Sequence, residues 1–405
     1  MKNKQSFKTN AAGGTIACAS LFSQILNIVD RPAFDRAVAR TGAEQRTKGF
    51  SSWNQFVAML FCQLAQAKSL REIEHGLRSC EGKLVHLGVA AAPVRSTLSY
   101  ANVHRPAALF EDVFYGLHSR CHAVAPRHKF RFKNPLLSLD ATVIDVCASM
   151  FDWARYRRTK GAVKLHLLLD HDGYLPVFAQ ITEGAVADVR IAQELLLPPG
   201  SIVALDRGYN DYHLFERWTQ AGVGFVTRLK SNAEWFVRAP LARSETGRIR
   251  RDDLIEFEVL TAGRKIFETY RRVEVWVEEK QMTLVLLTNL RHLSAATIAA
   301  IYKERWQIEL FFKAIKQNLR IKTFVGTSAN AVRTQIWTAL IAMLLIKYLQ
   351  FRSRCAWALS NLVAMLRWHL FTHRRLWAWL NRPYHSPPAA PPAYQLVLDG
   401  IGAPI

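Results

Sequence analysis

The sequence predicts a mixed α/β protein with helical regions at both ends of the chain. Residues 136–229 alternate between short apolar runs and amphipathic stretches, which indicates strands and helices within one layer. Residues 15–125 and 294–380 instead repeat apolar side chains at intervals of three and four, which is typical of helices. At 405 residues the chain is long enough for two or three domains of about 150 residues each.

The charge balance points to a polyanionic partner. The chain has 54 Lys and Arg against 32 Asp and Glu, a formal net charge of +22, and the excess runs along its whole length. With 50% hydrophobic and 21% charged residues, the composition excludes intrinsic disorder for most of the chain.

The apolar runs predict no membrane span and no secretory signal. None reaches the roughly 18 residues that a spanning helix requires, and residues 336–346 read as a buried core helix because Thr338 interrupts them. Six cysteines without a Cys-x-x-Cys pair favour reduced thiols in a cytoplasm.

The elements between 126 and 229 can be placed individually. The apolar, β-branched stretch 136–146 predicts a strand covered on both faces. Strands at 163–169 and 175–182 flank a turn whose Asp172-Gly173 pair suits positive φ. The remaining predicted elements are a helix at 187–197, a strand at 201–205, a helix at 212–221 and a strand at 225–229.

Changes in pattern divide the rest of the chain. Residues 230–290 alternate polar and apolar side chains, which predicts a β-rich insertion with one wet face. The prolines after Arg382, among them Pro383, Pro387, Pro388, Pro391 and Pro392, predict an irregular tail. The resulting regions are 1–125 (helical), 126–229 (first part of the α/β layer), 230–290 (β-rich insertion), 291–325 (helical continuation of the layer), 326–382 (C-terminal helical region) and 383–405 (Pro-rich tail).

Two aspartates lie where a carboxylate is costly to bury. Asp140 falls inside the apolar strand 136–146, and Asp206 follows the apolar run 201–205. Ligands gather at strand ends in open α/β sheets, so both are candidate site residues. The alternative is that each aspartate caps a turn or pairs with a neighbouring arginine.

A third candidate group lies on one predicted helix. Tyr302, Arg305, Glu309 and Lys316 are spaced by three, four and seven residues, which aligns them along one helical stripe. The alternative is a solvated face on which Arg305 pairs with Glu309.

Three motifs together resemble the DDE transposases of bacterial insertion sequences, specifically insertion-sequence family 4. They are Leu139-Asp140-Ala141-Thr142, Leu205-Asp206-Arg207-Gly208-Tyr209 and Tyr302-x-x-Arg305-x-x-x-Glu309-x6-Lys316. The segment from Phe50 to Phe56 also resembles the leading domain of one branch of that family. The resemblance implies a ribonuclease-H-like, retroviral-integrase-type core. From 206 to 309 is 103 residues, which leaves room for the predicted insertion at 230–290.

The resemblance also implies roles for residues. Asp140, Asp206 and Glu309 would be catalytic and would hold two Mg²⁺ ions, with Mn²⁺ able to substitute. Trp235 or Trp276 would stack on a flipped DNA base, with core packing as the alternative. The residues expected to contact DNA are Tyr302, Arg305, Lys316, Arg207 and Tyr209.

The activity implied is cut-and-paste transposition by end nicking, hairpin formation, hairpin opening and strand transfer. The partners would be the terminal inverted repeats of the element and a target DNA, bridged by a homodimer in the bacterial cytoplasm, associated with the nucleoid. We expect residues 1–125 to recognise DNA ends and residues 326–382 to serve assembly. The alternatives are a ribonuclease-H-like DNA nuclease without strand transfer and a catalytically inactive, transposase-derived repressor.

Overall fold

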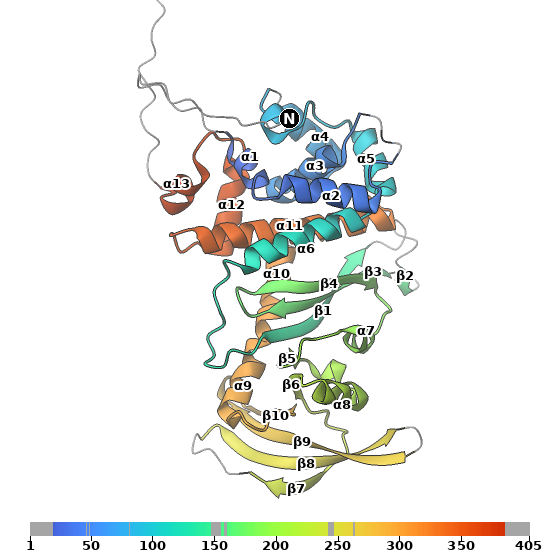
Figure 1. Ribbon diagram of the computed structural model, residues 1–405, viewed down its shortest axis with the longest axis vertical. Coiled ribbons are helices and arrows are strands. Elements are labelled where there is room, and N and C mark those ends of the chain that lie inside the picture. The colour runs from blue at the N-terminus through green and yellow to red at the C-terminus, as the bar shows by residue number, and fades with distance from the viewer. Residues whose placement is uncertain are drawn as a thin grey trace, which may run out of the picture.

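The structure is a computed structural model that describes residues 19–384, apart from 46, 48, 81, 147–154, 158–159, 242–246 and 262–263. Most of the predicted tail therefore lies outside the described residues. Three parts follow one another along the long axis: helices, a sheet with its covering helices, and a β-rich end (Figure 1).

The central sheet combines antiparallel and parallel strands. Its order is β4-β3-β1-β5-β6, and a short strand β2 (Arg155–Arg157) also pairs with β3. β3 is antiparallel to both β1 and β4, whereas β1, β5 and β6 run parallel. The bounds are β1 (Leu136–Val146), β3 (Lys160–Asp170), β4 (Leu175–Glu183), β5 (Ile202–Leu205) and β6 (Gly224–Arg228).

The predicted turn between β3 and β4 is confirmed. Gly173 has φ +69°, and a Cβ there would lie 2.7 Å from Phe351 and 2.9 Å from Ala125. Only glycine fits this position without displacing neighbours. The turn thereby lets one end of the sheet approach the helical part closely.

Helices cover the sheet on both faces because its strands alternate apolar side chains. Leu137, Leu139 and Val203 pack with α8 (Tyr212–Gln220), beside α7 (Asp188–Glu194). Leu136, Ile202 and Ala204 pack on the other face with α9 (Ala295–Glu304). α10 (Trp306–Asn318) continues along this second face and contacts β1. The two central strands are therefore buried on both sides.

The predicted β-rich insertion extends the same sheet. β10 pairs with β6, and the order continues through β9 and β8 to β7, so that ten strands form one sheet. A buried ion pair, Arg271 with Asp252, links β9 and β8. The bounds are β7 (Phe236–Pro240), β8 (Ile249–Thr261), β9 (Arg264–Val277) and β10 (Met282–Thr288).

The N-terminal and C-terminal helices share one hydrophobic core. α11 lies between α3 and α6, and residues 336–346 are buried as predicted. By length and composition α11 could cross a membrane, but 83% of its apolar window is buried within the protein. The bounds are α1 (Leu21–Leu26), α2 (Arg31–Thr41), α3 (Ser52–Ala65), α4 (Leu70–Arg78), α5 (Arg95–His104), α6 (Ala108–His122), α11 (Ala329–Arg352), α12 (Leu359–His369) and α13 (Leu376–Asn381).

Candidate active site

Asp140 and Asp206 lie level with each other because their strands are parallel and in register. β1 pairs with β5 so that Leu139 faces Leu205, and the next residue of each is the aspartate. Asp140 is in the middle of β1, whereas Asp206 follows the C-terminal end of β5. Two acids that are 66 residues apart in the chain (206 minus 140) are thereby brought together.

The Asp140 carboxyl group is partly buried and electrostatically coupled to the other acids. Its Oδ1 accepts a hydrogen bond from the N–H of Ala141 at 2.8 Å. Burial is the main reason that the pKa of Asp140 rises to about 6. The Ala141 N–H and Arg305 oppose this rise in the pKa of Asp140, whereas the charges of Glu309 and Asp206 add to it.

The predicted helical stripe is divided between two helices. α9 ends at Glu304 and α10 begins at Trp306, with Arg305 at the junction. The N–H groups of Arg305 and Ile308 donate to carbonyl groups three residues back, which marks a tighter step than an α-helix has. The expectation of one continuous helix is therefore wrong at Arg305, although both sides of the junction remain helical.

Arg305 connects the carboxylates from the sheet and the helix. Its Nη2 donates to Glu309 Oε1 at 2.6 Å, and its Nη1 lies 3.4 Å from Asp140 Oδ2. Its guanidinium also lies 5.7 Å from the centre of the Tyr302 ring. Further along α10, Lys316 Nζ donates to the Val143 carbonyl of β1 at 2.8 Å. The stripe thus faces the strand that carries Asp140.

The three carboxylates are chemically suited to a divalent cation. Carboxylate oxygens are hard donors of the kind that Mg²⁺ and Mn²⁺ prefer. Across the described residues, however, no three His, Cys, Asp or Glu side chains are grouped so that they could hold a metal ion. The positive charge between Asp140 and Glu309 is instead the Arg305 guanidinium. A cation bridging these two acids would have to displace it.

Comparison with known proteins identifies the family. The transposase DDE domain family matches residues 131–345, which contain all three acids and the intervening insertion. The chain belongs to the DDE transposase family. A domain of unknown function, DUF4372, matches residues 17–90.

Two bacterial relatives and one solved structure extend this comparison. A Sinorhizobium fredii protein named as a transposase, y4zB, is 31% identical over 74% of this chain and 83% of its own length. A Geobacillus stearothermophilus protein named as a transposase for insertion sequence element IS5377 is 31% identical over 55% of this chain and 59% of its own. A piggyBac transposase synaptic complex with hairpin DNA gives a TM-score of 0.40 at 10% identity, covering 91% of this chain and 81% of that one, too weak to establish a common fold.

Arg207 and Tyr209 differ in their access to a DNA strand. In this transposase Arg207 is exposed, whereas Tyr209 is only 2% exposed. Burial raises the pKa of Tyr209, and the charges of Asp140, Asp188 and Asp206 act in the same direction. Tyr302 is also buried. Of the residues expected to contact DNA, these two tyrosines are therefore the least accessible to a strand.

Asp188 contacts two residues of β3 and is not the N-cap of its own helix, α7. The N-cap of α7 is Ala187. The Asp188 carboxylate instead lies 3.0 Å from Lys164 Nζ and 3.7 Å from His166 Nδ1, both on β3. The alternation of Lys164 and His166 predicts that they share one strand face, but the sequence pattern suggests Asp188 as a helix cap and does not reveal its contact with them.

The two tryptophans expected to stack on a DNA base are both half-buried in the insertion. The Arg272 guanidinium lies 4.4 Å from the Trp235 ring centre, and the Arg250 guanidinium 5.4 Å from that of Trp276. By contrast, Trp306 on α10 is 53% exposed and directly follows Arg305. Sequence reasoning missed Trp306, although it falls outside the apolar periodicity of the buried side of α10.

Proposed function

We propose that this transposase moves its own insertion sequence by metal-dependent cut-and-paste chemistry, with Asp140, Asp206 and Glu309 as the catalytic acids. The observation that carries the proposal is the convergence of three separate segments: two adjacent parallel strands bring the aspartates level, and Arg305 joins Asp140 to Glu309. The order β4-β3-β1-β5-β6 supports a ribonuclease-H-like core, because three antiparallel strands (β4, β3 and β1) are followed by two strands, β5 and β6, that run parallel to β1. The three motifs support membership of insertion-sequence family 4.

The acids would bind two Mg²⁺ ions, or Mn²⁺ in their place, which supply an activated oxygen nucleophile and stabilise the leaving oxygen. Arg305 would hold a phosphate through paired hydrogen bonds once it leaves the acids, and Lys316 and Arg207 would add positive charge. Phosphate binding and cation binding would thus both require the Arg305 side chain to move away from Asp140 and Glu309. The proposed steps are end nicking, hairpin formation, hairpin opening and strand transfer.

The remaining regions support end binding and pairing. We assign recognition of DNA ends to residues 1–125 and assembly of a homodimer on the paired ends to residues 326–382. The shared core of these regions would make recognition and assembly parts of one rigid unit. Base stacking during hairpin formation falls to Trp235 or Trp276, with the exposed Trp306 as a third candidate. The bacterial relatives support a bacterial cytoplasm, with nucleoid association through DNA.

Cleavage of the element's own ends tests the proposal. Purified protein is incubated with Mg²⁺ and duplexes that carry the DNA flanking its gene, and the cut ends are mapped. D140N, D206N and E309Q should each abolish cleavage and retain end binding, whereas D35N, an exposed change on α2, should cleave normally. Magnesium-dependent cleavage by any of the three variants would overturn the assignment.

Precut ends separate transposition from simple cleavage. When such ends are supplied with a target plasmid, a transposase yields joined products, a nuclease yields cut target alone and an inactive repressor yields neither. We expect joined products.

A further inference from the structure

The exposed face of α5 is chemically unlike an ordinary solvated helix face. It carries Ser96, Thr97 and His104, together with Tyr100 at 66% and Val103 at 42% exposure. The Tyr100 and His104 rings stack at 3.9 Å. The helix contains no acidic residue. Hydroxyl, aromatic and apolar groups therefore face solvent together, and the helix itself adds no negative charge to them.

The opposite face of α5 is fixed to the helical core. Asn102 is buried, and its Oδ1 accepts a hydrogen bond from Gln55 of α3 at 2.8 Å. Asn330 of α11 donates to the carbonyl groups of Asn102 and Arg105, which holds the C-terminal end of the helix. The exposed face is thus presented on a rigid support.

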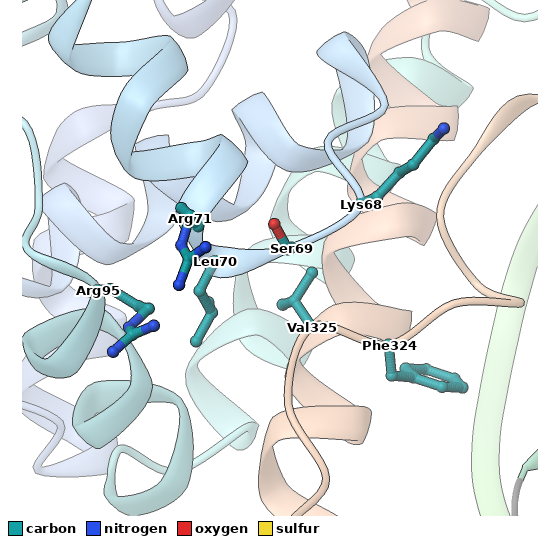
Figure 2. Close-up of a pocket in the computed structure, with 7 residues that line it drawn as sticks. All are labelled: Lys68, Ser69, Leu70, Arg71, Arg95, Phe324 and Val325. Atoms are coloured by element: carbon teal, nitrogen blue, oxygen red, sulfur yellow. The ribbon is translucent and has the colours of Figure 1, made fainter.

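A basic pocket adjoins the start of α5. It has a volume of about 390 Å³, and Figure 2 shows Arg71 and Arg95 beside each other while Lys68 lies further along the rim. A second pocket of about 300 Å³ shares Arg71 and Arg95 and is also lined by Glu74, whose carboxylate accepts a hydrogen bond from the Arg95 N–H at 3.0 Å. Within the described residues no ion pair involves the side chains of Lys68, Arg71 or Arg95. Nearby Arg78, by contrast, is neutralised by Glu74 at 2.6 Å.

Positive charge continues from this pocket to the candidate active site. Phe324 and Val325, in the loop after α10, line the same pocket as Lys68. Lys322 precedes that loop segment and is close enough to Lys316 to contribute to the lowering of its pKa, of which burial is the larger cause. Gln66 Nε2 donates to the Asn318 carbonyl at 2.9 Å, which fixes the end of α10 against the helical part.

We propose that α5 reads base edges in the major groove of a duplex DNA end, while Lys68, Arg71 and Arg95 hold its phosphates. The inference deepens the proposed function and rests on it. A major groove about 12 Å wide admits one helix, Ser and Thr hydroxyls can pair with either kind of base-edge group, and an apolar side chain can contact a thymine methyl. The three unpaired cations complement a phosphate backbone, and Lys322 and Lys316 extend that track towards the acids.

The test measures binding by full-length protein that carries E309Q, so that DNA is not consumed. The probes are 40-base-pair duplexes that tile the DNA flanking the gene, with shuffled duplexes of equal composition. We expect Y100A with H104A to lower the preference for the flanking duplex at least tenfold while affinity for shuffled DNA changes little. R71A with R95A should weaken binding to all duplexes alike and reduce the log-log salt slope by about two.

Two further variants exclude loss of folding as the cause. S96E places an acid in the first turn of α5, which favours the helix but repels phosphate, so binding should be lost while the melting temperature is kept. R190A removes an exposed arginine from α7, outside the regions assigned to DNA binding and assembly, and should bind like the parent.

The binding and cleavage results distinguish a failure of DNA reading by α5 from a failure of the proposed transposition function. If Y100A with H104A and S96E both bind with the parent's preference, α5 does not read DNA, and the face serves a protein partner instead. That result leaves cleavage by protein with an intact Glu309 unaffected. If such protein cuts no flanking duplex, the proposed function fails whatever α5 binds.

Discussion

Asp140 gives the candidate site a pH-dependent stability in the absence of metal. Its folded-state pKa of about 6 lies above the ordinary 3.8, so folding favours the protonated carboxyl group. The stabilisation is complete below pH 3.8 and is lost as the pH rises through about 6. In EDTA at pH 8, the free energy of unfolding of D140N should therefore exceed that of the wild type by up to about 3 kcal/mol. This difference should disappear near pH 4. Urea unfolding at both pH values measures it, and a gap that widens on acidification would contradict the burial argument.

Arg305 should compete with divalent cations for the acids. R305A removes the counter-charge of Asp140 and Glu309 and should destabilise the metal-free protein by about 1–3 kcal/mol. Saturating Mg²⁺ should then raise the melting temperature of R305A more than that of the wild type, because binding to the folded state alone adds stability. R190A, which breaks an exposed Arg–Glu pair of the same spacing on α7, is the matched control and should change neither quantity. Equal Mg²⁺ shifts in R305A and wild type would rule out competition.

The sequence could predict which residues belong to the candidate site, but not which of them contact one another. Asp140 and Asp206 were detectable because a carboxylate in an apolar strand has few explanations. The Arg305–Asp140 contact joins residues 165 positions apart, and no local pattern encodes it. The burial of Tyr209 and Tyr302 also depends on neighbours supplied by distant strands and helices.

At the scale of elements, a buried ion pair between β8 and β9 stabilises the insertion, and its contribution to stability can be measured. Arg271 bonds both Asp252 oxygens at 2.7–2.8 Å and the Leu293 carbonyl, just before α9, and both side chains are nearly inaccessible. R271M would leave Asp252 buried and uncompensated, which should cost about 3–5 kcal/mol. R238A, which breaks the exposed pair with Glu256, should cost less than about 1 kcal/mol. Urea unfolding compares them, and similar losses would show that burial does not govern the pair.

Most elements could be placed from periodicity to within a few residues. β1 matches its predicted range, α8 ends one residue before its predicted end, and β6 begins and ends one residue earlier than predicted. The break at Arg305 could not be predicted, because the hydrogen bonds to carbonyl groups three residues back leave the apolar periodicity of α9 and α10 unchanged. α7 is shorter than expected because the chain leaves helical geometry at Leu195, before the prolines.

For the whole molecule, the net charge of +22 predicts binding that depends strongly on salt. Each neutralised phosphate contributes about −0.9 to the log-log slope, so six or more contacts give about −5 or steeper. Binding to a flanking duplex between about 50 and 200 mM salt measures the slope. A flat response would exclude recognition through the DNA backbone.

The arrangement of the helical regions could not be predicted from the sequence. Apolar periodicity showed that residues 336–346 are buried but not what buries them. In the structure, α3 and α6 from the first third of the chain supply that cover.

This shared core has a consequence for synthesis. The start of α11 comes 264 residues after the end of α3 (329 minus 65), a stretch that a ribosome takes roughly 15–50 s to translate at about 5–20 residues per second. Throughout that interval the leading helices lack their central partner. If the leading helices bind DNA as proposed, we expect a nascent chain not to bind its own gene before α11 has been made, and prematurely terminated products should be degraded rather than compete with intact protein for DNA.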